Sequence, residues 1–91
     1  MAIIALFEVE GATAAKYDEV IRRLTDMGLR VPDGQMYHIC YGDRRRLQVI
    51  DVYESQAQLD AFAAKLMPIL HEMQITAKPT ILDVYNIIQG G

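Results

Sequence analysis

This sequence has one cysteine, no tryptophan and little net charge. Cys40 is the single cysteine, which excludes an internal disulfide and a metal site built from several cysteines, and fits the reducing cytoplasm. The net charge is only −3, from 9 basic residues against 12 acidic ones, so it gives no field for holding nucleic acid or an anionic membrane. We therefore expect a cytoplasmic protein with neither of these partners.

Long apolar runs and the common catalytic motifs are also missing. No apolar stretch reaches the roughly 18 residues that a membrane-spanning helix needs. The apolar N-terminus has no basic segment before it and meets Glu8 early, so we expect a strand there and no signal peptide. There is no glycine-rich phosphate loop, nucleophile elbow or paired-histidine motif. Function therefore has to be sought in the placement of single residues.

What the sequence does contain is a regular succession of hydrophobic patterns. Apolar runs and alternations predict strands over residues 2–9, 36–41, 47–53 and 80–88, whereas three- and four-residue spacing predicts helices over 13–27 and from 55 to about 73. Thr13 can cap the first helix, Gly28 follows its end, and Ser55 with Gln58 forms a capping box for the second helix.

Two prolines mark the second half of the chain. Pro68 lies inside the second helix, where it removes a backbone donor, so we expect a kink or a break near Met67. Pro79 is expected at the first residue of the last strand, where proline is tolerated. The resulting order, β-α-β-β-α-β, is the ferredoxin-like plan, in which two helices pack on one face of a four-stranded antiparallel sheet. We predict one α+β domain over residues 1–91.

Both faces of this sheet are apolar, although two helices can cover only one. In the last strand three apolar side chains point each way, and the first and third strands repeat the pattern. The alternating sets of the last strand are Ile81, Tyr85 and Ile87 against Leu82, Val84 and Ile88. An uncovered face of this kind is rare on soluble monomers, so we predict a homodimer in which two sheets stack.

Five segments carry a family resemblance, in the right order over nearly the whole chain: MYHICYG, LQVIDVYES, QLDAF, KLMPIL and TILDVYNII. The chain resembles the dimeric α/β-barrel superfamily, and within it the antibiotic-biosynthesis-monooxygenase-like domains. The resemblance implies two protomers that join their sheets into a dimeric α/β barrel, with a ligand cleft between each sheet and its own helices. Members include cofactor-independent oxygenases of quinol- or anthrone-type aromatics, haem-degrading enzymes and proteins with no known activity.

The haem-degrading members offer a residue-by-residue comparison. They use an asparagine on the first strand, a tryptophan on the second helix and a later histidine. Here the first strand offers Phe7 and Glu8, Phe62 occupies the tryptophan's place, and Glu72 falls at the histidine's spacing with His71 one residue short. These departures argue against haem degradation, and a haem-binding relative is a third alternative that a haem titration would test.

His38 is the leading catalytic candidate, because histidine titrates near neutral pH and can serve as a base. Its partner depends on the hairpin loop. A two-residue loop (43–44) would put His38 opposite Val49, a four-residue loop (43–46) would put it opposite Asp51, and a three-residue loop would separate His38 from Asp51. An even loop therefore predicts a His38–Asp51 pair, and we name Tyr53 as the tyrosine that would join it.

The remaining site candidates are aromatic or flexible side chains that could line a pocket. They are Tyr37, Tyr41, Phe62, Met67 and Tyr85, whose ordinary alternative is core or interface packing. No metal site and no cofactor is expected. Two functions follow: a cofactor-independent monooxygenase acting on a small quinol- or anthrone-type aromatic, or a non-catalytic dimeric barrel that binds a small apolar ligand or is purely structural. The enzyme needs His38 and a tyrosine to converge on an enclosed cavity between sheet and helices, ligand binding needs only the cavity, and a filled core would leave the structural role.

Overall fold

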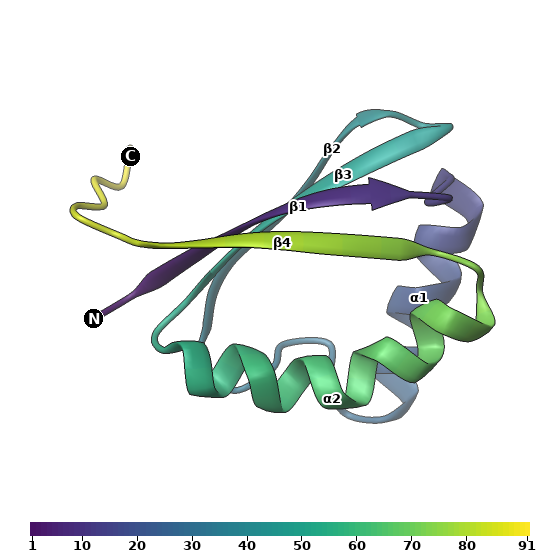
Figure 1. Cartoon of the computed structure of the whole chain (residues 1–91), viewed down its shortest axis with the longest axis horizontal. Coiled ribbons are helices and arrows are strands. Elements are labelled where there is room, and N and C mark those ends of the chain that lie inside the picture. Colours follow the sequence, from purple (N-terminus) through teal and green to yellow (C-terminus); the bar gives the residue numbers. More distant parts are fainter.

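The computed structural model describes all 91 residues and has the predicted element order (Figure 1). The elements are β1 (Ile3–Glu10), α1 (Ala14–Asp26), β2 (Gln35–Asp43), β3 (Arg46–Tyr53), α2 (Gln56–Glu72) and β4 (Thr76–Asp83). The strands form one antiparallel sheet in the order β2-β3-β1-β4. The predicted ferredoxin-like fold is therefore confirmed.

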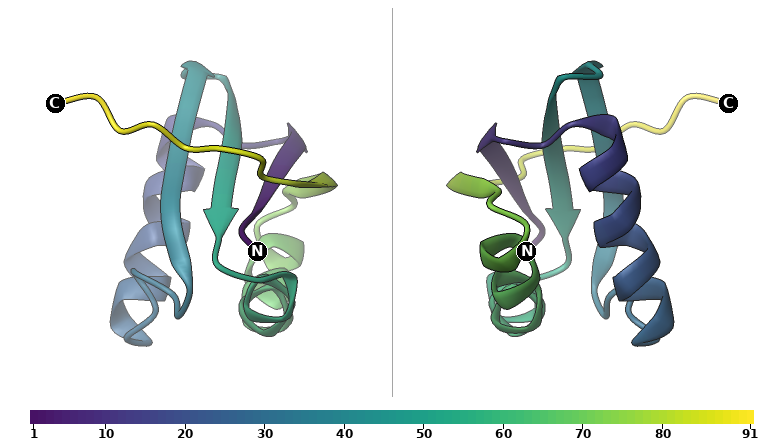
Figure 2. Two further views of the ribbon diagram at one scale, coloured as in Figure 1. Left: turned by 90° about the vertical axis from the view of Figure 1, so that its left-hand side faces the viewer. Right: turned by 90° about the vertical axis from the view of Figure 1, so that its right-hand side faces the viewer.

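Both helices lie on the same face of the sheet. In the two side views of Figure 2, α1 lies under the β2 side of the sheet and α2 under the β4 side. The core fills the space between these layers and includes Val9, Val20, Leu24 and Leu70, all buried. Neither helix is long and apolar enough to cross a membrane.

The helix ends follow the predicted caps. The Thr13 hydroxyl accepts a hydrogen bond from the Lys16 amide, and the Ser55 hydroxyl accepts one from the Gln58 amide at 3.2 Å. Each bond satisfies a donor that the first helical turn leaves free. Gly28 follows the cap of α1 with φ of 73°, a left-handed conformation that glycine adopts at little cost.

α2 does not break at Pro68, although the sequence allowed for a break there. The helix is continuous from Gln56 to Glu72, and its last turns are inclined to its first ones (Figure 1). Pro68 removes one backbone hydrogen bond, but Ile69 and Leu70 directly after it are buried in the core. Their packing holds the chain in the helix through the proline.

The last strand lies earlier in the chain than predicted. β4 ends at Asp83, which pairs with Ile3 at the beginning of β1. One further backbone hydrogen bond joins the Val84 amide to the Ala2 carbonyl at 2.9 Å, and the residues after Val84 have no strand to pair with. The prediction that the strand runs to residue 88 is therefore wrong, and Tyr85 and Ile88 are exposed in the tail. Pro79 lies in the middle of β4, which is tolerated because β4 is an edge strand.

The β2–β3 hairpin settles the register that the sequence left open. Asp43 pairs with Arg46, so the loop is Arg44–Arg45, and the Asp43 carboxylate accepts a hydrogen bond from the Arg45 amide at 2.8 Å. This register places His38 opposite Asp51. The four-residue loop predicted this same pairing of His38 with Asp51. In the structure the loop itself has only two residues, because Asp43 and Arg46 pair with each other as the last rung of the two strands.

Candidate active site

His38 and Asp51 face the helices from neighbouring strands. His38 Nδ1 lies 2.6 Å from Asp51 Oδ1. The Asp51 side chain is only 8% exposed and that of His38 is 29% exposed, so the pair borders the interior. A carboxylate only accepts hydrogen bonds, so the Nδ1–H group donates to Asp51 and the lone pair of Nε2 accepts a hydrogen bond from another donor. Asp51 thereby fixes both the orientation and the tautomer of the imidazole.

Tyr17 on α1 completes a chain of three side chains. Its hydroxyl lies 2.6 Å from His38 Nε2, and the two rings are nearly parallel, with an interplanar angle of 6°. Burial, together with the nearby Cys40 and Asp51, raises the pKa of Tyr17 to about 12. The phenol therefore keeps its proton at neutral pH and donates it to Nε2. The order of donation is Tyr17 to His38 to Asp51.

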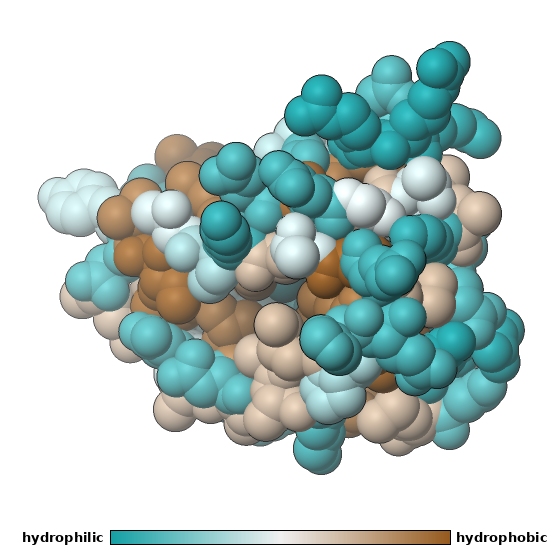
Figure 3. Space-filling view, turned by 45° about the vertical axis from the view of Figure 1, so that its right-hand side comes forward, coloured by the Kyte–Doolittle hydropathy of each residue, from teal (hydrophilic) through white to brown (hydrophobic).

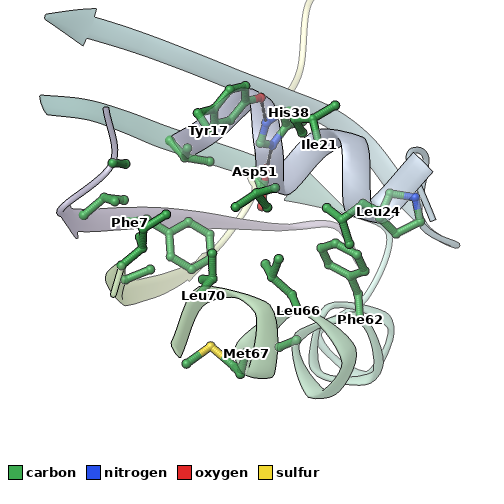
Figure 4. Close-up of a pocket in the computed structure, with 18 of the residues that line it drawn as sticks. Phe7, Tyr17, Ile21, Leu24, His38, Asp51, Phe62, Leu66, Met67 and Leu70 are labelled. Carbon is green, nitrogen blue, oxygen red and sulfur yellow. Dashed lines mark hydrogen bonds and ion pairs between the residues drawn. The ribbon is translucent and has the colours of Figure 1, made fainter. Parts of the chain in front are cut away.

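A cavity of about 120 Å³ lies beside this chain, between the sheet and the two helices. Twenty-one residues line it, and 16 of these are hydrophobic. Figure 4 shows Tyr17, His38 and Asp51 at one wall, with Phe62, Leu66, Met67 and Leu70 of α2 across from them. For comparison, an apolar cavity of about 150 Å³ holds one benzene molecule. The space therefore suits a single aromatic ring.

The two predicted site residues on α2 are part of the cavity wall. Phe62 and Met67 both line the cavity, and Met67 is 49% exposed, which places it at the rim. Tyr53 lies behind this layer. It is fully buried, stacks on Phe62 and places its hydroxyl 3.5 Å from Gln35 Oε1. Burial raises the pKa of Tyr53, which does not line the cavity.

Three other predicted tyrosines do not line the cavity. Tyr37 pairs with Val52, so its side chain and that of Tyr41 project from the face of the sheet that the helices leave open. The Tyr37 hydroxyl accepts a hydrogen bond from the Gln89 side chain in the tail. Tyr85 is fully exposed beyond the end of β4. No group of three or more His, Cys, Asp and Glu side chains gathers that could hold a metal ion.

Sequence reasoning missed Tyr17. In the sequence Tyr17 stands three and seven residues before Val20 and Leu24, a spacing that puts all three on one apolar face of α1, and all three line the cavity. A hydroxyl on a stripe that faces the core is a signal, because a buried hydroxyl needs a hydrogen-bond partner. Only the fold shows that the partner is His38, because the two residues are 21 positions apart.

The sequence matches no protein-family model and no curated protein sequence. Solved structures do resemble it over almost their full length. SnoaB from Streptomyces nogalater, a cofactor-independent oxygenase, is 16% identical with a TM-score of 0.61, and the match covers 98% of this chain and 96% of that one.

Two further structures belong to proposed antibiotic biosynthesis monooxygenases. The protein from Deinococcus radiodurans is 13% identical with a TM-score of 0.63, covering 100% of this chain and 99% of its own. The protein from Caulobacter crescentus is 18% identical with a TM-score of 0.58, covering 93% and 89%. At these identities the likeness confirms the predicted ferredoxin-like fold of the chain.

Proposed function

We propose that this chain is a cofactor-independent oxygenase of small aromatic substrates of the quinol or anthrone type. The observation that carries the proposal is His38, held between Asp51 and Tyr17 at the wall of an apolar cavity. The fold shared with SnoaB, a cofactor-independent oxygenase, supports it. In such chemistry the protein removes a proton, and the electron-rich anion of the substrate then reduces dioxygen without a bound cofactor.

The pair of His38 and Asp51 suits the first step. When His38 accepts a proton it becomes an imidazolium, and the Asp51 carboxylate at 2.6 Å stabilises that charge. The apolar walls hold the ring of the substrate and keep water from the anion that forms. For an anthrone the balance is simple: the ring CH₂ and dioxygen become a carbonyl and water.

The size of the cavity favours the smaller of the two substrate types. A space of about 120 Å³ suits one ring, whereas a three-ring anthrone would require its walls to move. Quinols with one ring are therefore the preferred substrates. For a quinol, one oxygen atom of dioxygen bonds to a ring carbon in place of a hydrogen, the ring is oxidised to a hydroxyquinone, and the other oxygen atom leaves as water.

Oxygen uptake with a panel of hydroquinones and anthrones tests this function. The wild-type protein should consume dioxygen with a quinol, and His38→Ala should lower the rate by about 10²–10⁴-fold, the usual contribution of a positioned base. His71→Ala is the matched control, because His71 is exposed on α2 and does not line the cavity. Uptake that His38→Ala leaves unchanged would contradict the proposal.

A non-catalytic ligand-binding protein is the second candidate. The observation in its favour is that both ring nitrogens of His38 already have partners, so no lone pair of the imidazole is free. A small aromatic that binds in the cavity without any oxygen uptake would support this function. If a substitution that fills the cavity abolishes binding, the ligand occupies the cavity.

We also propose that the open face of the sheet packs against a second copy of the chain. Large hydrophobic side chains are exposed there, including Leu6, Ile39 and Leu82 at 38%, 50% and 52% exposure. Figure 3 shows the mixture of hydrophobic and hydrophilic surface on one side of the molecule. The exposed tail adds Tyr85 and Ile88, which contact no core. A twofold dimer would cover these groups.

Sedimentation equilibrium tests the dimer. The wild-type protein should have twice the mass of the 10.3 kDa chain, and Ile39→Glu should shift it toward the monomer, because a charge would then have to be buried in the interface. Arg22→Glu, on the exposed side of α1, is the control and should leave the mass unchanged. A monomeric wild-type protein would contradict the proposal.

A further inference from the structure

His38 has no nitrogen free to reach a substrate. Nδ1 donates to Asp51 and Nε2 accepts from Tyr17, each at 2.6 Å. A substrate in the cavity can therefore meet Nε2 only if Tyr17 moves away. The Tyr17 oxygen, in contrast, gives its proton to Nε2 and can still accept a hydrogen bond from a substrate in the cavity that it lines.

We propose that Tyr17 is the catalytic residue that touches the substrate and that it relays the substrate's proton to His38. This inference rests on the proposed function and specifies its first step. The substrate is then a one-ring phenol or quinol whose hydroxyl donates to the Tyr17 oxygen. A compound whose acidic proton is only on carbon would lack that hydrogen bond.

The relay moves two protons together. The substrate O–H bond breaks and its proton forms a new O–H bond at Tyr17. At the same time the original Tyr17 O–H bond breaks, and that proton forms an N–H bond at His38 Nε2. The products are a substrate phenolate, a neutral Tyr17 and a His38 imidazolium beside the Asp51 carboxylate. The imidazolium later returns its proton through Tyr17 to the reduced oxygen atom, which leaves as water.

Geometry supports this path. The acceptor lone pair of Nε2 lies in the plane of the imidazole, and a phenol O–H lies close to the plane of its own ring. The two rings are within 6° of parallel with centroids 5.9 Å apart, and the Tyr17 oxygen lies 2.6 Å from Nε2. The hydrogen bond is therefore short enough for a direct proton transfer.

Electrostatics support the concerted form of the step. The pKa of Tyr17 is raised to about 12 by burial, so a free tyrosinate would be unfavourable in this setting. A relay avoids that species, because Tyr17 gains one proton as it loses the other. The charge that forms is instead on His38, where Asp51 is in contact with it.

The test compares Tyr17→Phe with His38→Ala in two assays. In oxygen uptake with a quinol, both variants should lose about 10²-fold or more, and the double variant should lose no more than either alone, because the residues act as a unit. If His38 were the direct base, Tyr17→Phe would free Nε2, and the rate would stay the same or rise. That result would overturn the relay and leave the proposed function standing.

The second assay does not need turnover. 4-Nitrophenol has one ring, and its absorption spectrum distinguishes phenol from phenolate. At a pH below its own pKa, bound probe should be ionised in the wild-type protein and in His71→Ala, and neutral in Tyr17→Phe and His38→Ala. Ionised probe in Tyr17→Phe, or neutral probe in the wild-type protein, would overturn the relay. A Tyr17-dependent ionisation without oxygen uptake would uphold the relay and refute the oxygenase.

Discussion

The cavity makes a prediction about stability that is independent of any substrate. Ala63 on α2 is partly buried and lines the cavity, so a larger side chain at this position would extend into it. Ala63→Leu adds three carbon atoms. The cavity of about 120 Å³ has room for them, since one water molecule in the liquid occupies about 30 Å³ and a carbon group is of similar size.

The expected gain follows from the buried surface. Three added carbon groups at about 0.8 kcal/mol each would stabilise the folded state by about 2.4 kcal/mol. Fixing the leucine rotamer costs about 0.5–1 kcal/mol, which leaves about 1.5 kcal/mol. For a domain of this size, that corresponds to a rise in melting temperature of about 6–12 °C. The same substitution should exclude the ligand.

Thermal and urea unfolding measure the gain, and titration with 4-nitrophenol measures the loss of binding. The control is Ala64→Leu, because Ala64 is exposed on the neighbouring position of α2 and does not line the cavity. We expect the control to change the free energy of unfolding by less than about 0.5 kcal/mol and to bind the probe normally. An Ala63→Leu protein that is less stable than the wild type and still binds the probe would refute the reasoning.

Three further outcomes can be measured on the same protein. Gly11→Ala should cost about 2 kcal/mol or more in urea unfolding, because Gly11 has φ of +84° and an added Cβ would lie 2.6 Å from the Gln74 carbonyl oxygen; Gly28→Ala meets no such neighbour and should cost only about 1 kcal/mol. The pKa of Glu19 is lowered to about 2 by hydrogen bonds from two arginines, so its contribution to stability is present above its unfolded pKa of 4.5 and is lost as the pH falls through 2; Glu19→Gln should flatten this part of the urea-midpoint profile. The pKa of Tyr17 is raised to about 12 because the folded state favours the neutral phenol, so its contribution to stability is present below pH 10 and is lost as the pH rises through about 12. Tyr17→Phe should therefore remove one tyrosine ionisation near pH 12 from the ultraviolet titration.

The hairpin shows how far periodicity alone could go. Strand alternation placed His38 and Asp51 on one face for any even loop, and that much needed only the two-residue period of a strand. The pairing itself depended on whether Asp43 and Arg46 belong to the loop or to the ladder. The Asp43 carboxylate settles this by accepting from the Arg45 amide, which closes a tight turn. The pattern of hydrophobic residues does not predict a local hydrogen bond of this kind between a side chain and the backbone.

The tyrosines show where pattern reasoning fails. Tyr37 and Tyr41 are on strands that were predicted correctly, but which face of a sheet the helices cover is a property of the whole fold. Tyr85 was placed on a strand because the apolar alternation continues to residue 88. In the structure β1 begins at Ile3, so the ladder with β4 ends at Asp83, and only the Val84 amide bonds beyond it, to the Ala2 carbonyl. The length of a strand is limited by its neighbour, and its own composition cannot show that limit.

The bulge in β2 explains why the active face could not be derived from one strand. Gln35 and His38 both line the cavity, although a separation of three residues puts side chains of a regular strand on opposite faces. The register shifts between Gln35 and Tyr37, so the strand gains one residue and both side chains turn inward. Tyr17 then reaches His38 from a helix. The chain lacks a recognisable catalytic motif because its candidate groups come from a helix and from two strands whose pairing depends on a bulge and a tight turn.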